Sequence, residues 1–274
     1  MRSLQAAWNP VPMASDPQFA PETLVPVASL TVRGDELGEN GKVSPSNVLR
    51  WLEHGRWAAL SGDDESMRHL FSEGHIVVVR AQKVAFLREL DWNERVQVSI
   101  GLAKVGRTSC EFAQQLRAPG NVLVAEARIS VVHLGSDRRP AEIPADVRAR
   151  SLEMPVPESL QRLEPVDLTG QPVHFTYNFS VRPSDIDVFH HVNHARYLDY
   201  AEDLRGLAEL ADALPGWKNG RALAAVSIDY AREALVRDNL TAECMVVSGT
   251  ELAWRLRRGE VLLTAGRLRV HDAA

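Results

Sequence analysis

The sequence predicts an α+β protein built from two copies of one unit, in which an antiparallel sheet surrounds a single helix. The chain repeats itself at a nearly fixed spacing, and in each copy one helical segment is followed by long strands with short connections. Short connections between successive strands favour antiparallel pairing, and a lone helix with an apolar face must bury it against such a sheet.

The repeat appears when the sequence is compared with itself. At a spacing of 149 residues, seven identities fall without a gap between residues 32 and 60. After residue 84 the spacing becomes 144, so the second copy lacks five residues between its helix and the next strand. A match of this kind indicates a duplicated structural unit. The identities pair Val32 with Val181, Arg33 with Arg182, Val43 with Val192, Leu49 with Leu198, Glu53 with Glu202, Arg56 with Arg205 and Ala59 with Ala208.

In the second copy, the spacing of apolar residues predicts a helix over 192–211. Runs of strand-forming residues bounded by Gly, Asn, Asp or Arg predict the strands. These are expected at 174–182, 222–231, 240–248, 251–257 and 261–270, with first-copy strands at 75–87, 95–105, 110–117 and 122–134. We therefore expect an N-terminal extension (1–21), an N-terminal domain (22–137), a linker (138–171) and a C-terminal domain (172–274), because six prolines fall within 136–172.

Composition limits the class of protein. Of 274 residues, 45% are hydrophobic, the net charge is -5, and no apolar run of about 18 residues could span a membrane. The start of the chain lacks the apolar core of a signal peptide, so we expect a cytoplasmic protein. Cys110 and Cys244 lie in strand-like runs, which favours two buried thiols over a disulfide. The negative charge argues against general nucleic-acid binding.

Reactive side chains are densest between Ser184 and Leu198, just before the predicted helix. A helix start offers unpaired N–H groups, so the backbone amides of Val192 and Asn193 are a candidate oxyanion site. Asp187 and His191 could move a proton or position water. The first copy has Gly38, Lys42 and Ser44 at the positions of Asp187, His191 and Asn193, so we expect the second copy to carry the chemistry.

Three segments resemble a known family. The pattern from Asp185 to Asn193, with Tyr197, Leu198 and Glu202 after it, resembles the hotdog-fold thioesterases, and two such units in tandem resemble the acyl-acyl-carrier-protein thioesterases of plants and bacteria. Residues 228–233 resemble that family's second catalytic segment, and residues 138–148 resemble its interdomain stretch. The resemblance implies two tandem hotdog domains, each an antiparallel sheet wrapped around a central helix, and hydrolysis of fatty acyl thioesters.

Carried over by position, the resemblance assigns catalysis to Asp187, His191 and Glu233. Phe189 stands where the family has a catalytic asparagine, and Ala234 stands where plant members often have a cysteine. Without that cysteine, attack by water is favoured over a covalent route. The base is a carboxylate, or His191 oriented by Asp187, and Asn193 or His190 is a candidate to replace the missing asparagine.

The remaining expectations concern ligands and partners. Phe189 and the apolar helix residues Val48, Trp51 and Leu52 of the first copy are candidates to contact the acyl chain. We expect no cofactor, and a metal at His190 and His194 is disfavoured because no third ligand is evident. The expected partner is an acyl carrier protein, docking on Arg138, Arg139, Arg148 and Arg150 or on Arg255, Arg257 and Arg258. Monomer and homodimer are both reasonable. Two other functions stay open, a thioesterase for CoA or specialised acyl thioesters and a non-catalytic acyl-binding module.

Overall fold

The computed structural model describes residues 24–61, 70, 74–161, 163, 168 and 170–272. The predicted N-terminal extension lies outside these residues. The chain forms two compact units, one of residues 1–78 and 87–155 and one of residues 79–86 and 156–274. Within the described part, no helix is both long enough and apolar enough to cross a membrane.

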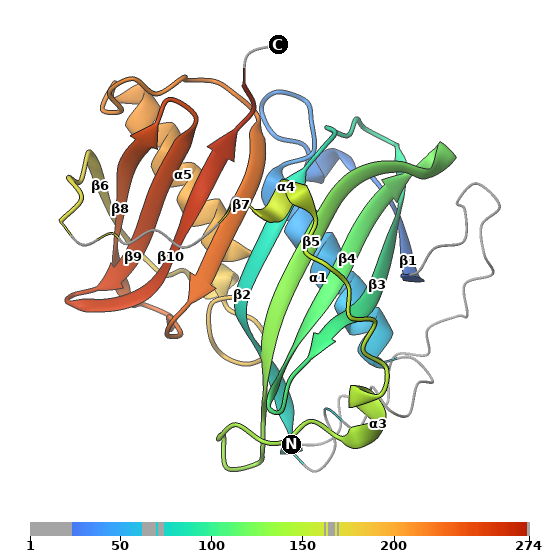
Figure 1. Cartoon of the computed structure of the whole chain (residues 1–274). Helices are drawn as coiled ribbons and strands as arrows, with labels where there is room; N and C mark the ends of the chain where they lie inside the picture. Colours follow the sequence, from blue (N-terminus) through green and yellow to red (C-terminus); the bar gives the residue numbers. More distant parts are fainter. Residues whose placement is uncertain are drawn as a thin grey trace. The chain divides into compact units, whose positions relative to one another are not determined.

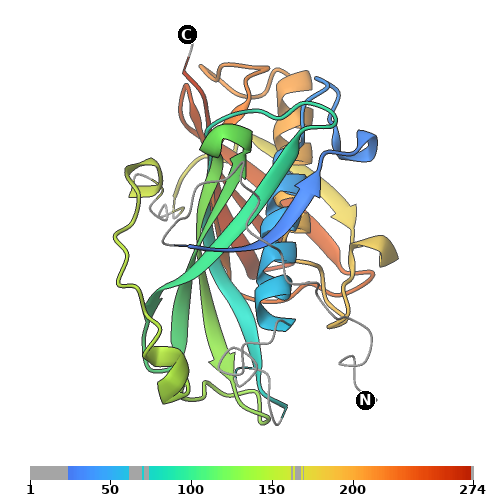
Figure 2. The ribbon, with the colours of Figure 1, turned by 90° about the vertical axis from the view of Figure 1, so that its right-hand side faces the viewer.

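Within the described residues, the first unit pairs four strands around one long helix. Its strands are β1 (Val25–Thr31), β3 (Arg95–Val105), β4 (Ser109–Ala118) and β5 (Val122–Leu134), and they pair antiparallel in that order (Figure 1). Helix α1 (Pro45–Ser61) packs on β1, β3 and β4, and Figure 2 shows its length along the strands. The short helices are η2 (Gly34–Glu36), η4 (Pro119–Asn121) and α3 (Ala145–Arg148).

The second unit has the same plan with more strands. Its antiparallel order is β2-β7-β10-β9-β8-β6, and α5 packs on β6 and β8. The elements are β2 (Ile76–Phe86), α4 (Glu158–Gln161), β6 (Phe175–Ser180), η5 (Pro183–Asp185), α5 (Arg196–Leu210), β7 (Leu223–Tyr230), β8 (Asn239–Ser248), β9 (Glu251–Arg258) and β10 (Val261–Val270). The predicted α+β class with an antiparallel sheet and one long helix per unit is confirmed.

The strands predicted from sequence are all present, and 95–105, 122–134 and 261–270 have the predicted bounds. The sequence-based prediction did not include a residue range for β1. The helix predicted over 192–211 begins only at Arg196, which is a correction. The residues predicted to begin the helix make other contacts. Val192 forms an antiparallel bridge with Ile186, and the Asn193 side chain accepts the Ala195 N–H.

One feature of the units differs from the predicted division. Residues 79–86 of β2 belong to the second unit, where they pair with β7. The boundary at 155/156 falls inside the predicted linker. The linker's first part adds backbone hydrogen bonds to β3, from Leu152 N to Leu102 O and from Met154 N to Ala103 O. Its second part packs Leu160 and Leu163 on the second unit, against Ala85 and Ala225.

The apolar face of α5 forms much of the second core. Its buried residues recur at helical spacing, and the helix packs on β6 and β8 of the sheet. Cys110 and Cys244 are both free and buried, as predicted. Burial raises the pKa of the Cys110 thiol to about 12 and that of Cys244 to about 11, so neither is a ready nucleophile.

Candidate active site

A tight hairpin carries Asp187 and His191. Ile186 and Val192 bridge at its base. The Asp187 N–H donates to the His191 carbonyl at 3.0 Å, and the His190 N–H donates to the Asp187 carbonyl at 3.0 Å. His190 closes the turn with a φ of 67°, a left-handed conformation that strains a residue with a Cβ atom. The hairpin therefore fixes both reactive side chains on a short, constrained loop.

The two side chains approach each other across this loop. Asp187 Oδ1 accepts the Phe189 N–H at 2.8 Å, and Asp187 Oδ2 lies 3.8 Å from His191 Nε2. His191 Nδ1 lies 3.4 Å from the Phe189 carbonyl oxygen. With the Nδ1 hydrogen donated to that carbonyl, Nε2 faces the carboxylate and is available to a proton. The pair can therefore hold or transfer a proton at Nε2.

The first unit contains the same hairpin with other side chains. Leu37 and Val43 bridge, the Gly38 N–H donates to the Lys42 carbonyl at 2.7 Å, and Gly41 takes the left-handed position with a φ of 73°. At the repeat spacing, Gly41 corresponds to His190 and Gly38 to Asp187. The backbone loop is thus a property of both copies, and the carboxylate and imidazole belong to the second alone.

Glu233 lies on the loop that follows β7, and this loop is attached to the hairpin. The Val192 N–H donates to the Ala234 carbonyl at 2.9 Å. Glu233 is exposed, and its carboxylate makes no hydrogen bond or ion pair with any residue the structure describes. The negative charges of Glu233 and Asp187 both act on the buried hydroxyl of Tyr197, where burial, with these charges adding to it, raises the pKa to about 12. The structure therefore brings the loops of all three predicted catalytic residues together.

The matching loops of the first unit are joined by polar side chains. Asn40 Nδ2 donates to Glu89 Oε1 at 3.5 Å, and Lys42 Nζ pairs with Asp91 at 2.6 Å. The counterparts in the second unit are Phe189 with Glu233 and His191 with Leu235. Neither of these pairs can form such a polar contact, so the two loops of the second unit are not joined in this way, and the Glu233 carboxylate is not held by the hairpin.

Phe189 sits at the tip of the hairpin. Its side chain is 42% exposed, and its ring lies nearly parallel to the His191 ring, with centroids 6.0 Å apart. Val188 beside it is also exposed. The site therefore has an apolar edge at the position where the resemblance expected an asparagine.

The predicted oxyanion site is contradicted by the backbone hydrogen bonds. The Val192 N–H donates to the Ala234 carbonyl, and the Asn193 N–H donates to the Asp185 carbonyl at 3.0 Å. Each amide has a single hydrogen, which a backbone carbonyl already binds. The Asn193 side-chain oxygen accepts the Ala195 N–H at 2.9 Å, so its visible role is to cap the turn before α5. A catalytic role for Asn193 stays a prediction.

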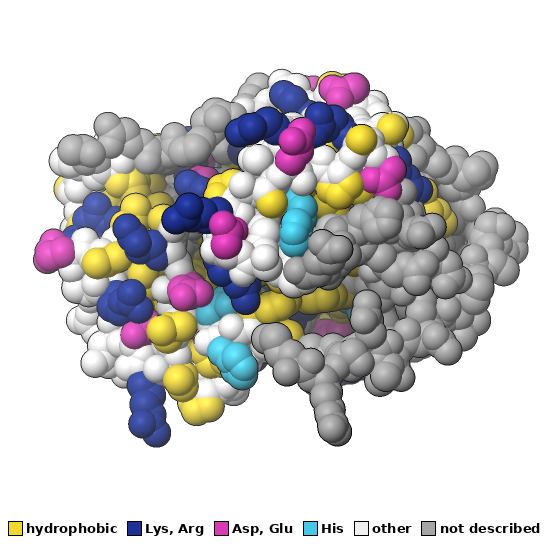
Figure 3. All heavy atoms as spheres, turned by 90° about the horizontal axis from the view of Figure 1, so that it is seen from below, with side chains coloured by type: hydrophobic (Ala, Val, Ile, Leu, Met, Phe, Trp, Pro, Cys, Tyr) yellow, Lys and Arg dark blue, Asp and Glu magenta, His cyan; other side chains and the backbone are white. Residues whose placement is uncertain are grey.

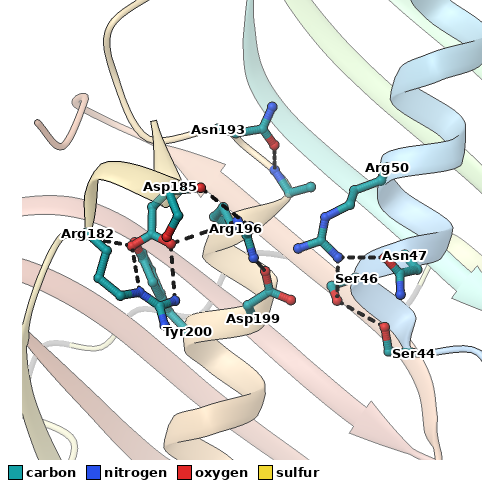
Figure 4. Close-up of polar contacts among 12 residues, drawn as sticks. Ser44, Ser46, Asn47, Arg50, Arg182, Asp185, Asn193, Arg196, Asp199 and Tyr200 are labelled. Carbon is teal, nitrogen blue, oxygen red and sulfur yellow. Dashed lines mark hydrogen bonds and ion pairs between the residues drawn. The ribbon is translucent and has the colours of Figure 1, made fainter. Parts of the chain in front are cut away.

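Asp185 lies directly before the hairpin and anchors its base through buried hydrogen bonds, a role that was not predicted from the sequence. The fully buried carboxylate accepts the Tyr200 hydroxyl at 2.8 Å and the backbone and guanidinium N–H groups of Arg182, while Arg196 lies 3.9 Å away (Figure 4). Burial opposes ionisation, but the Arg182 and Tyr200 hydrogen bonds hold the pKa of Asp185 below its usual value. The arrangement recurs in the first unit, where Glu36, the counterpart of Asp185, accepts hydrogen bonds from Arg33 and Trp51, although these bonds cannot be seen in the sequence alone.

The other predicted substrate contacts lie in the core of the first unit. Val48, Trp51 and Leu52 are buried on α1, and the Trp51 indole N–H donates to Glu36 at 2.9 Å. Their contact with an acyl chain stays a prediction. Among the described residues, no group of three or more His, Cys, Asp or Glu is placed to hold a metal ion.

The chain matches the Thioesterase-like superfamily over residues 32–151 and 181–263, one segment in each copy of the repeat. Because the match covers most of the chain, this protein belongs to that superfamily. A curated relative, the chloroplastic palmitoyl-acyl carrier protein thioesterase of Arabidopsis thaliana, is 23% identical over 85% of this chain. The match spans 58% of that relative's length.

Solved structures show the same tandem hotdog fold. An acyl-ACP thioesterase from Bacteroides thetaiotaomicron aligns with a TM-score of 0.73 and 17% identity, over 89% of this chain and 96% of that one. The 12:0-ACP thioesterase of Umbellularia californica aligns with a TM-score of 0.71 and 17% identity, over 90% and 93%. At this identity the likeness establishes the fold, and the chemistry must be argued from the site.

Proposed function

We propose that this protein hydrolyses fatty acyl thioesters carried by acyl carrier protein, releasing a free fatty acid. The observation that carries the proposal is that Asp187, His191 and Glu233 occur together only in the second copy, on backbone loops that both copies share. The hairpin itself does not need Asp187 or His191, because the first copy folds the same hairpin with Gly38 and Lys42, while the counterpart of Glu233 is Glu89. The names of the curated relative and of the aligned structures support acyl carrier protein as the carrier.

The chemistry is attack of water on the thioester carbonyl. Asp187, Glu233 or His191 takes a proton from water as its oxygen bonds to the carbonyl carbon. The carbon–sulfur bond then breaks, and the departing thiolate receives the proton, which leaves a fatty acid and the carrier thiol. Ala234 offers no nucleophile, so no acyl-enzyme is required. The amides of Val192 and Asn193 have no part in this scheme.

A second candidate function is hydrolysis of CoA or specialised acyl thioesters on the same scaffold, and Phe189 favours it. At the tip of the hairpin, an exposed phenyl ring in place of an amide offers different contacts to a substrate. The preferred carrier of the acyl group can therefore differ from acyl carrier protein. A non-catalytic acyl-binding module is disfavoured, because binding alone does not need the three ionisable groups. Oligomeric state and the cytoplasmic location stay predictions.

The test is a hydrolysis panel of acyl chain lengths on acyl carrier protein and on CoA, measured by release of free thiol. Asp187→Asn and Glu233→Gln should each lower kcat by about a hundredfold or more, because each keeps the shape and removes a base. Glu89→Gln, the matching change in the first unit, is the control and should keep full turnover. Absence of hydrolysis on every substrate would sink the proposal, and full activity of either variant would remove that residue from the scheme.

A further inference from the structure

The peptide group between Glu233 and Ala234 is anchored by the helix. Its N–H, on Ala234, donates to the hydroxyl of Tyr197 at 3.2 Å. Tyr197 lies in the first turn of α5 and is 3% exposed. On the far side of Ala234, the next carbonyl accepts the Val192 N–H of the hairpin. Ala234 therefore connects Glu233 to the helix on one side and to the hairpin of Asp187 and His191 on the other.

The repeat separates what the fold requires from what has been added. In the first unit, the Val43 N–H donates to the Leu90 carbonyl at 3.0 Å, which matches the bond from Val192 to Ala234. The position of Tyr197 is taken by Val48, which has no hydroxyl. The carbonyl contact is thus common to both units, whereas the hydroxyl contact exists only in the unit with the three candidate catalytic residues.

We propose that Tyr197 is a positioning residue that orients Glu233 through the Ala234 amide. The inference rests on the proposed function, because activation of water by Glu233 requires its carboxylate to point in a defined direction. An exposed glutamate with no hydrogen-bond partner among the residues that the structure describes can exchange between rotamers. The hydrogen bond to Tyr197 fixes the peptide plane that directly follows Glu233. This restricts the backbone conformation of Glu233, and so limits the directions in which its carboxylate can reach a water molecule.

The hydroxyl can be removed without disturbing the packing of the ring. The Tyr197 ring meets Tyr230 edge-on at 5.3 Å and Tyr200 at 6.1 Å, and Tyr197→Phe keeps both contacts. The matched control is Tyr200→Phe, on the same helix, where a buried hydroxyl donates to Asp185 and not to the Glu233 loop. Both variants lose one buried hydrogen bond, so thermal melting can be compared between them.

The experiment measures kcat and KM on an acyl thioester for wild type, Tyr197→Phe, Glu233→Gln and the double variant. We expect Tyr197→Phe to lower kcat about tenfold or more with little change in KM. In the Glu233→Gln background the same change should cost less than about twofold, because the group it orients is gone. Tyr200→Phe should have the same effect in both backgrounds.

The outcomes separate this inference from the proposed function. Loss of turnover in Glu233→Gln together with wild-type kcat in Tyr197→Phe would overturn the positioning role alone. An equal fold loss from Tyr197→Phe in both backgrounds would also overturn it, since that is the result of a structural role. Full activity of Glu233→Gln would overturn the inference and the catalytic assignment of Glu233 together.

Discussion

Gly55 and Gly206 both lie inside long helices, and the packing around them gives the two residues opposite meanings. A Cβ atom on Gly55 in α1 would lie 2.5 Å from Val98 Cγ1, and Val98 is fully buried in β3. A Cβ on Gly206 in α5 would meet nothing within 4 Å. Gly55 is therefore required for helix and sheet to approach, whereas Gly206 only weakens its helix.

The same substitution should change stability in opposite directions at these two sites. Gly206→Ala should raise the free energy of unfolding by about 0.5–1 kcal/mol, because alanine favours the helix. Gly55→Ala should lower it by about 1–3 kcal/mol, since the overlap with Val98 exceeds the helical gain. Denaturant unfolding of both variants checks this. A stabilised Gly55→Ala protein would contradict the packing of α1 on β3.

The candidate catalytic residues could be found from sequence, but their supports could not. Asp187 and His191 stand out because their chemistry differs from that of Gly38 and Lys42, their counterparts in the first copy, whereas Glu233 aligns with Glu89 and is assigned by the family resemblance. Asp185 and Tyr197 are ordinary residues in sequence. Their roles depend on hydrogen bonds, from Tyr200 to Asp185 and from Ala234 to Tyr197, that form only after the helix has packed beside its loops.

At the scale of elements, the start of α5 was predicted four residues too early. The apolar pattern extends back to Val192. The Val192 N–H, however, donates to the Ala234 carbonyl, and the helix begins only at Arg196. The oxyanion prediction failed for the same reason, because it assumed that Val192 and Asn193 opened the helix. Local propensity cannot report a hydrogen bond to a distant loop.

A histidine pair joins the beginning of β2 to the end of β5. His75 Nδ1 lies 3.1 Å from His133 Nε2, and His133 Nδ1 faces the carbonyl oxygens of Ala141 and Glu142 at 3.3 and 3.2 Å. Burial lowers the pKa of His133, and the neighbouring His75 adds to this effect. Neutral His133 can donate from Nδ1 to a carbonyl and accept from His75 at Nε2, an arrangement that a second proton disrupts.

This pair should make stability fall on acidification. The pKa of folded His133 lies below the unfolded value of about 6.5, so the unfolded chain binds the proton first. The contribution is complete above about pH 6.5 and declines as the pH falls through the folded pKa. Melting temperature should therefore drop between about pH 7 and 5, and less steeply in His133→Asn. His271→Asn, at an exposed site, is the control, and identical slopes for all three proteins would refute the role of the pair.

At the scale of the whole molecule, the surface charges bear on how the proposed carrier protein would approach. On the face shown in Figure 3, basic, acidic and hydrophobic side chains are interspersed. Several arginines proposed from sequence as docking residues are engaged with carboxylates in the structure, among them Arg148 with Glu142, Arg255 with Glu243 and Arg258 with Asp238. Arg232 and Arg237, exposed on the Glu233 loop, make no ion pair within the described residues.

Arg237 should therefore contribute to carrier recognition. Arg237→Glu should raise KM for acyl-acyl carrier protein several-fold, and the effect should weaken at high salt, because exposed charges act mainly on encounter. Turnover of a small acyl thioester without a carrier protein should not change. Arg139→Glu in the first unit is the matched charge reversal. A rise in KM for Arg139→Glu alone would place docking on the interdomain arginines.

The sequence by itself determined the duplicated α+β architecture, most strand positions and the copy that carries Asp187, His191 and Glu233. These are properties of local pattern and residue chemistry, and an internal repeat makes them visible in one chain. Only the tertiary structure decided that residues 79–86 join the second unit, that the Val192 and Asn193 amides are engaged and that Tyr197 holds the Glu233 loop. These features depend on hydrogen bonds between segments that meet only in the folded chain, which folding selects and which no local pattern encodes.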